Sequence, residues 1–163
     1  MADNKRTIVI CNDVGLYFDA LTRGKHYEVL AEDEAKEQIR VVGDNNRARW
    51  FRKYYFVPDG NSVPVLVNWT FDDTIQDSSE ESLEHIEVTV TFSEGDKRWC
   101  SLCTKAGLLG YIERNMDDNV FLIENQVIVK NFSKEVVTDA LKRLDQQNQL
   151  LSSTKPFTKE VNQ

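Results

Sequence analysis

The stretch Ile86-Glu87-Val88-Thr89-Val90-Thr91-Phe92 decides the fold of the C-terminal half of the chain. Its apolar residues occupy every second position and alternate with Glu and Thr. Because the side chains of a strand point alternately to its two faces, this pattern predicts a strand with one buried face and one solvated face. The turn residues Ser93 to Asp96 follow, so Lys97–Cys103 is predicted to return as the second strand of a hairpin.

Two helices are predicted after this hairpin. Thr104 can cap a helix that ends at Asn115, with Leu108, Leu109 and Ile112 facing the core. Ser133 can cap a longer amphipathic helix from Lys134 to about Leu151. Short strands are predicted between the helices, at residues 120–123 and 126–129. The order β-β-α-β-(β)-α therefore predicts a small α+β module over residues 85–157, with a flexible tail at 158–163.

The N-terminal part of the chain is predicted to be a set of short strands. Its β-branched and aromatic runs, separated by turn residues, are 7–11, 26–30, 39–42 and 47–51. A helical turn is expected within residues 52–56. A further strand is predicted at Val63–Phe71, where Pro64 favours the edge of a sheet because proline cannot donate to a neighbouring strand.

Two stretches of this region resemble SH3-like barrels. Leu16–Leu30 is similar to the opening strand, the loop and the second strand of such domains, and Arg49–Val57 is similar to their closing strand, helical turn and last strand. The resemblance covers about a third of the chain and implies a small SH3-like β-barrel over residues 1–58. The fold class expected for the whole chain is α+β, with this barrel followed by a β-hairpin and two-helix module.

The departures from the family bear on ligand choice. SH3 domains that bind polyproline use a tryptophan at the start of a middle strand and an acidic loop. Here the Ile39–Val42 strand begins without tryptophan, and Arg52 occupies the position of a family proline. Polyproline binding is therefore not expected. The hairpin at Phe92–Cys100 resembles that of uncharacterised bacterial proteins, which suggests a bacterial origin and implies no activity.

The acidic character of the chain is concentrated in one segment. The formal net charge is −7, but residues 1–58 and 85–163 are each within one charge of neutrality. Residues 59–84 carry seven acidic residues and no Lys or Arg. This change in composition predicts an edge strand and an acidic linker at 59–84, which either screens basic residues or serves as a spacer.

The chain is expected to be cytoplasmic and not to bind membranes. Its apolar runs are shorter than the roughly 20 residues that span a bilayer, and Thr7–Cys11 is too short for the core of a signal peptide. The three cysteines, Cys11, Cys100 and Cys103, are too few for a disulfide framework. On a strand, Cys100 and Cys103 point to opposite faces, which argues against a redox pair. Tetrahedral zinc needs four ligands, and neither His26 nor His85 is spaced to complete a site with these two cysteines.

No catalytic residue is predicted. The sequence has two histidines, no Gly-x-Ser-x-Gly motif and no glycine-rich phosphate loop. Paired acids such as Asp72-Asp73 lie in turns, where such pairs are usually solvated. We therefore expect a protein that is not an enzyme and needs no cofactor or metal.

The candidate binding residues lie in the segment 47–55, which interleaves cations with aromatic residues. They are Arg47, Arg49, Arg52, Lys53 and Tyr54. Such a strip could bind phosphates and stack on bases. Alternatively, it is ordinary barrel construction in which Trp50 and Phe56 fill the core, and the low charge of the domain favours this second interpretation.

The function expected from these observations is that of a protein-binding or adaptor protein. Small acidic bacterial proteins of this kind include immunity-type and regulatory proteins. The alternative is a nucleic-acid-associated protein that uses the strip at 47–55. The partner is therefore expected to be another protein, or a nucleic acid in the alternative case.

Limited proteolysis tests the predicted organisation. Because the acidic, Ser-rich segment is expected to be an exposed loop, the first cuts should fall between Asp72 and Glu84. Mass spectrometry of the early fragments locates these cuts. First cuts within residues 47–56 or 86–103 would contradict the predicted boundaries.

Overall fold

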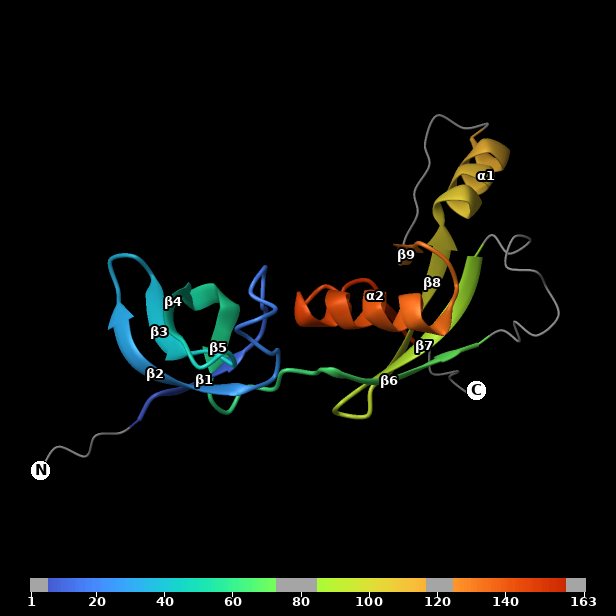
Figure 1. Ribbon diagram of the computed structural model, residues 1–163. Helices are drawn as coiled ribbons and strands as arrows, with labels where there is room; N and C mark the ends of the chain where they lie inside the picture. The colour runs from blue at the N-terminus through green and yellow to red at the C-terminus, as the bar shows by residue number, and fades with distance from the viewer. Residues whose placement is uncertain (1–5, 73–84, 117–124, 158–163) are drawn as a thin grey trace, which may run out of the picture. The chain divides into compact units, whose positions relative to one another are not determined.

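The structure is a computed structural model that describes residues 6–72, 85–116 and 125–157 (Figure 1). The described residues form ten strands, two α-helices and one short 3-10 helix, so the predicted α+β class is confirmed. The chain divides into two compact units. The N-terminal unit extends to Val65 and includes Asp145–Asn148, and the C-terminal unit comprises Leu66–Leu144 and Gln149–Gln163.

The N-terminal unit is built on a five-stranded antiparallel sheet, which curves strongly in Figure 1. Its elements are β1 (Ile8–Cys11), β2 (His26–Asp33), β3 (Gln38–Val42), β4 (Ala48–Arg52), the 3-10 helix η1 (Lys53–Tyr55) and β5 (Phe56–Pro58). The strand order is β4-β3-β2-β1-β5. The sheet is not closed into a barrel, because β4 and β5 remain its two edges. The expectation of a closed barrel is therefore wrong, whereas the helical turn between the last two strands is confirmed.

β2 is longer than the sequence predicts. It was expected to end at Leu30, but it runs to Asp33. Its pairing with β3 shifts register between Val29 and Ala31, which marks a β-bulge. The bulge lets the strand bend and continue through polar residues, a feature that alternation alone cannot reveal.

The core of this unit contains Phe51 and not Trp50. Phe51 is 1% exposed and pairs with Ile39 across the sheet, on the buried face. Trp50 pairs with Arg40 and is therefore on the opposite face, where it is 43% exposed. The prediction that Trp50 fills the core is wrong, because two adjacent aromatics on a strand cannot both face inward and the sequence alone does not fix the phase.

Arg23 is a buried cation in the N-terminal unit. Its guanidinium forms an ion pair with Asp145 at 3.0 Å, and both side chains are almost completely buried. Nε donates to the carbonyl of Asn12 at 2.7 Å, Nη1 also donates to the carbonyl of Pro64, and Nη2 donates to Oδ1 of Asn148 at 3.0 Å. Burial lowers the pKa of Arg23, and the Asp145 carboxylate opposes that effect. The pairing offsets the large cost of removing a charge from water.

The C-terminal unit is built on a second sheet. Its elements are β6 (Leu66–Phe71), β7 (His85–Phe92), β8 (Lys97–Thr104), α1 (Lys105–Asn115), β9 (Gln126–Val129), α2 (Lys134–Gln146, of which the last two residues belong to the N-terminal unit) and β10 (Lys155–Pro156). The order is β10-β8-β7-β6, and β9 pairs with β8 in parallel. The predicted β7–β8 hairpin and the edge position of β6 are confirmed.

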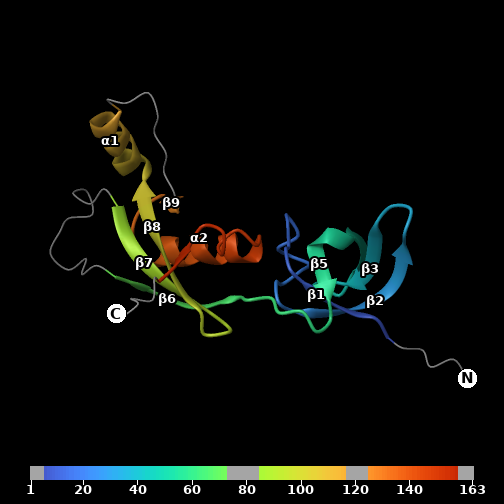
Figure 2. The same ribbon diagram turned by 180° about the vertical axis from the view of Figure 1, so that it is seen from behind.

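α2 covers one face of this sheet, as both views show (Figures 1 and 2). Val137 and Leu141 of α2 pack in one core with the alternating apolar residues of β7, Ile86, Val88, Val90 and Phe92. The Ser133 hydroxyl accepts a hydrogen bond from the Val136 amide at 3.3 Å, which confirms the predicted cap. The helix ends at Gln146, earlier than the predicted Leu151.

α1 does not lie on the sheet. It begins where β8 ends and continues beyond it (Figure 1), and Thr104 caps it by accepting from the Gly107 amide at 3.1 Å. None of its described residues is fully buried, and Leu109 is about half exposed. The prediction that Leu109 faces the core is therefore wrong, because a helix that extends past its strand has no sheet face beneath it.

The cysteines are free and buried. Cys100 belongs to the core with Leu102, whereas Cys103 lies outside that core and its thiol donates to Oε1 of Gln126 at 3.7 Å. The two sulfurs are thus on different faces of β8, as predicted. Burial raises the pKa of Cys100 to about 12, so its thiol is a poor nucleophile at neutral pH.

Three predicted features fall outside the described residues. They are the acidic segment at 73–84, the strand at 120–123 and the tail at 158–163. Within the part of the chain that is described, no helix is both long and apolar enough to span a membrane.

The phase of β4 predicts a clear difference between two neighbouring aromatics. Phe51→Ala should cost about 3–5 kcal/mol of unfolding free energy, because it leaves a cavity in the core. Trp50→Ala should cost less than about 1 kcal/mol, because this side chain is on the solvated face. Urea unfolding of both variants measures the difference, and equal losses would contradict the observed register.

Candidate functional site

The loop before β2 places Tyr17 half-buried against the core of the N-terminal unit. Oδ1 of Asp13 accepts a hydrogen bond from the Gly15 amide at 2.7 Å, which closes a tight turn. Gly15 has a φ of 55°, a left-handed conformation that favours glycine. A Cβ atom at this position would lie 2.7 Å from the ring of Tyr55. The loop therefore packs its backbone directly against Tyr55, which only glycine permits.

The helix η1 presents two tyrosines side by side. The ring centroids of Tyr54 and Tyr55 are 4.4 Å apart, and the Tyr54 hydroxyl donates to the Tyr55 hydroxyl at 3.1 Å. This hydrogen bond, together with burial, raises the pKa of Tyr55 to about 12. The Tyr55 hydroxyl is therefore protonated at neutral pH. Tyr54 is 68% exposed, although its neighbour holds it in place.

Tyr17 connects these tyrosines to a cation. Its ring meets Tyr55 edge-on at 5.8 Å, and the Arg49 guanidinium lies 5.3 Å from the Tyr17 centroid. Such a geometry allows a cation–π interaction of about 0.5–1 kcal/mol at an exposed site. We call Tyr17, Arg49, Tyr54 and Tyr55 the Tyr–Arg cluster. Leu16 is adjacent in sequence and is 85% exposed, so apolar surface continues beside the cluster.

The structure divides the predicted binding strip between several environments. Arg49 and Tyr54 come together in the Tyr–Arg cluster. Arg52 instead donates from Nη1 to the carbonyl of Lys36 at 2.8 Å. Lys53 forms ion pairs with Glu32 and with Glu34. Five residues that are close in sequence therefore do not form one surface.

Arg47 lies between the β3–β4 turn and β4. Its backbone amide donates to Oδ1 of Asn45 at 3.2 Å, and its side chain is exposed. Asn46, the preceding residue, has a φ of 59°, as the tight turn requires. Arg47 is thus held by its backbone, and its charge faces solvent.

A second candidate surface lies on the opposite face of the hairpin. Trp50 is directly across from Arg40, and Arg52 is two residues further along β4 on the same face. We call Arg40, Trp50 and Arg52 the Trp50 face. All three residues are exposed. Because consecutive residues of a strand point to opposite sides, Arg49 of the Tyr–Arg cluster cannot act together with this face.

The chemistry available in the Tyr–Arg cluster is recognition by contact. Its groups are neutral phenols, aromatic rings and a guanidinium, which stack and form hydrogen bonds. Within the described ranges no group of three or more His, Cys, Asp or Glu residues could hold a metal ion. His26 lies 3.4 Å from Asp59 with both side chains exposed, and His85 is exposed at the start of β7.

Tyr17, Tyr55 and Gly15 were missed as site residues. The stretch from Leu16 to Asp19 carries the resemblance to SH3-like domains, which by itself indicates a fold and no binding residue. Gly15 next to an aromatic stretch was the available signal, since an isolated glycine often marks a close approach of the backbone. Their proximity to Arg49 depends on tertiary contacts that no local pattern encodes.

The chain matches no protein-family model, no curated protein and no solved structure.

Proposed function

We propose that the chain is a non-catalytic protein-binding module that recognises an extended segment of another protein through the Tyr–Arg cluster. The observation that carries the proposal is Tyr54, a large aromatic that is 68% exposed yet packed against the ring of Tyr55 and hydrogen-bonded to its hydroxyl. Tyrosine and arginine dominate the binding energy of many protein interfaces. A side chain already held by its neighbours loses less conformational entropy when it binds.

The cluster indicates the chemistry of the segment that it would bind. The rings of Tyr17 and Tyr54 offer apolar contact, and the phenols offer hydrogen bonds to a peptide backbone. Arg49 is an exposed cation beside them, and it forms no ion pair with the described residues. An apolar residue followed by an acidic residue matches this arrangement, because a carboxylate can accept two hydrogen bonds from a guanidinium.

A relation of the N-terminal unit to SH3-like domains forms part of the proposal. The short helix η1 between β4 and β5 supports it, as does the position of Tyr17 in the loop that carried the resemblance. Polyproline is not the expected ligand, since β3 begins with Gln38 and Ile39 and has no tryptophan there. A cytoplasmic, bacterial regulatory role would suit such a module.

A peptide-display library panned against the full chain tests the proposal. The selected peptides should bind the Tyr54→Ala variant at least about tenfold more weakly than the unaltered chain. This is the effect of losing a contact worth roughly 1.4 kcal/mol. Fluorescence polarisation of a labelled peptide measures the affinity. The melting temperature of the variant should be nearly unchanged, because Tyr54 is mostly exposed.

Trp50→Ala is the matched control for this experiment. It removes an exposed aromatic from the same hairpin but from the other face. It should leave peptide affinity within about twofold, a difference of roughly 0.4 kcal/mol. If Trp50→Ala abolishes binding and Tyr54→Ala does not, the Tyr–Arg cluster is not the site.

A second candidate function is binding of single-stranded nucleic acid through the Trp50 face. The observation that favours it is the exposure of Trp50 between Arg40 and Arg52, where the sequence predicted a buried residue. An aromatic ring can stack on a base, and the two guanidinium groups can contact phosphates. The near-neutral charge of residues 1–58 argues that such binding would be weak at physiological salt.

Titration of a labelled single-stranded oligonucleotide tests this second function. Trp50→Ala should weaken binding by about 1–3 kcal/mol, the value of one stacked base. Replacing Arg40 and Arg52 by alanine should reduce the slope of log K against log salt by about 1.4, the value for two phosphates on a single strand. The second function would be contradicted by an absence of binding at low salt. It would also be contradicted if neither Trp50→Ala nor the replacement of Arg40 and Arg52 changed the binding.

A further inference from the structure

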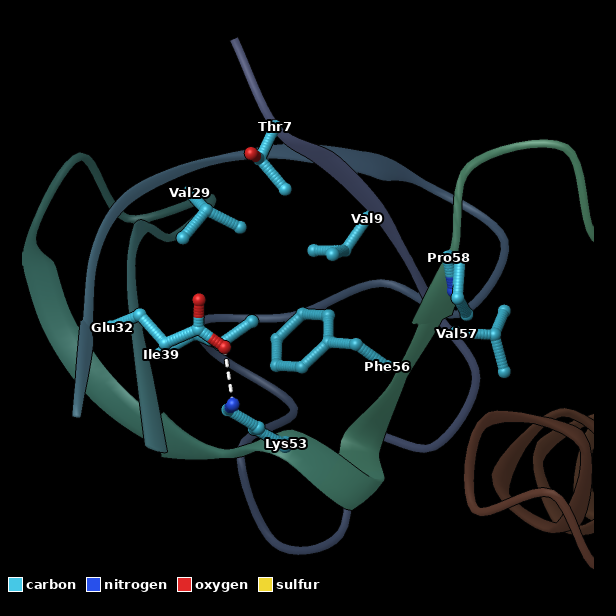
Figure 3. A pocket seen from close by; sticks show the side chains of 9 residues that line it. All are labelled: Thr7, Val9, Val29, Glu32, Ile39, Lys53, Phe56, Val57 and Pro58. Carbon is cyan, nitrogen blue, oxygen red and sulfur yellow. Dashed lines mark ion pairs between the residues drawn. The ribbon is translucent and has the colours of Figure 1, made fainter. Parts of the chain in front are cut away.

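The N-terminal unit contains a pocket of about 220 Å³ on the concave side of its curved sheet (Figure 3). Its apolar wall is formed by residues of β1, β2, β3 and β5, namely Val9, Val29, Ile39, Phe56, Val57 and Pro58. Figure 3 shows the ring of Phe56 in the middle of this wall. The pocket lies entirely within one unit and involves none of the residues of the Tyr–Arg cluster.

The size of the pocket suits one small apolar group. An apolar cavity of about 150 Å³ is enough to hold a benzene ring. A pocket of about 220 Å³ therefore has room for one ring, or for a branched chain of four to five carbons, together with a polar head group. It is smaller than the pockets that take drug-sized ligands.

One edge of the pocket is charged. Glu32 and Lys53 line it and form an ion pair with each other (Figure 3). The Lys53 ammonium also lies 2.9 Å from the carboxylate of Glu34. The Lys53 ammonium thus forms ion pairs with two carboxylates. Neither Glu32 nor Glu34 has a further ion-pair partner within residues 6–72. Glu32, Glu34 and Lys53 together carry a net formal charge of −1, and of these Glu32 and Lys53 line the pocket.

We propose that this pocket binds a small primary ammonium that carries a branched aliphatic or aromatic group. The apolar part occupies the wall formed by Val29 and Phe56, and the ammonium displaces part of the Lys53 interaction by pairing with Glu32. The excess negative charge selects a cation over a carboxylate.

This site is independent of the proposed peptide function. It lies on a different part of the unit and uses different side chains. If no peptide binds, the proposal for the pocket still stands. If no amine binds, the proposal for the Tyr–Arg cluster still stands.

Three probes that share one branched tail test the proposal. Isopentylamine carries a positive head, leucine a zwitterionic head, and isocaproate a negative head. Binding to the full chain is followed by chemical-shift changes of the backbone amides in NMR titrations. Isopentylamine should bind with a Kd on the order of 1 mM, as expected for a ligand with so few atoms. Leucine should bind more weakly, and isocaproate should show no saturation.

Matched variants locate the site. Glu32→Gln removes the pairing carboxylate and should weaken isopentylamine binding at least about fivefold, roughly 1 kcal/mol. Glu28→Gln removes a carboxylate from the same strand that does not line the pocket, and it should change nothing. Both residues are exposed, so both variants should fold. Val29→Phe fills the pocket and should abolish binding, with circular dichroism as the check on folding.

Several results would overturn the proposal. They are isocaproate binding as tightly as isopentylamine, isopentylamine binding equally well to Glu32→Gln, and no saturation by isopentylamine below about 10 mM, where a millimolar ligand must saturate. The proposal would also be overturned if the chemical-shift changes were spread over both units and were not concentrated in β1, β2 and β5.

Discussion

The pairing of Phe51 with Ile39 is the constraint on which the N-terminal surfaces depend. Because strand side chains alternate with a period of two, burying Phe51 fixes the direction of every other residue of β4. Arg49 is thereby placed beside Tyr17, and Trp50 and Arg52 are turned to the other side. A shift of one residue would bury Trp50 and would exchange the two surfaces.

The Tyr–Arg cluster is held by backbone geometry as much as by side chains. The left-handed conformation of Gly15 lets the loop pass directly over the ring of Tyr55. Tyr55 in turn contacts the ring of Tyr54 in a tilted arrangement and accepts a hydrogen bond from its hydroxyl. Ordering an exposed aromatic side chain costs conformational entropy, and the contacts with Tyr55 offset part of that cost for Tyr54.

The sequence was informative where one local pattern decides the outcome. The alternation of Ile86 to Phe92, the caps Thr104 and Ser133, and the turn at Lys53–Tyr55 each depend on neighbouring residues, and each was predicted correctly. The sequence predicted burial wrongly where contacts between distant residues determine it. Examples are the direction of Trp50 on β4 and the exposure of Leu109 on a helix that has no sheet beneath it. The meeting of Arg49 with Tyr17 belongs to this second kind.

The partners of Arg23 are spread along the chain. Asn12 is 11 residues away in sequence and Pro64 is 41 residues away, but Asp145 is 122 residues further on. A ribosome that adds roughly 5–20 residues per second needs about 6–24 seconds to reach Asp145 after Arg23 is made. During that interval the nascent N-terminal sheet carries a guanidinium whose carboxylate partner does not yet exist. Burial of Arg23 in this unit therefore waits until Asp145 has been synthesised, and until then the guanidinium stays open to water.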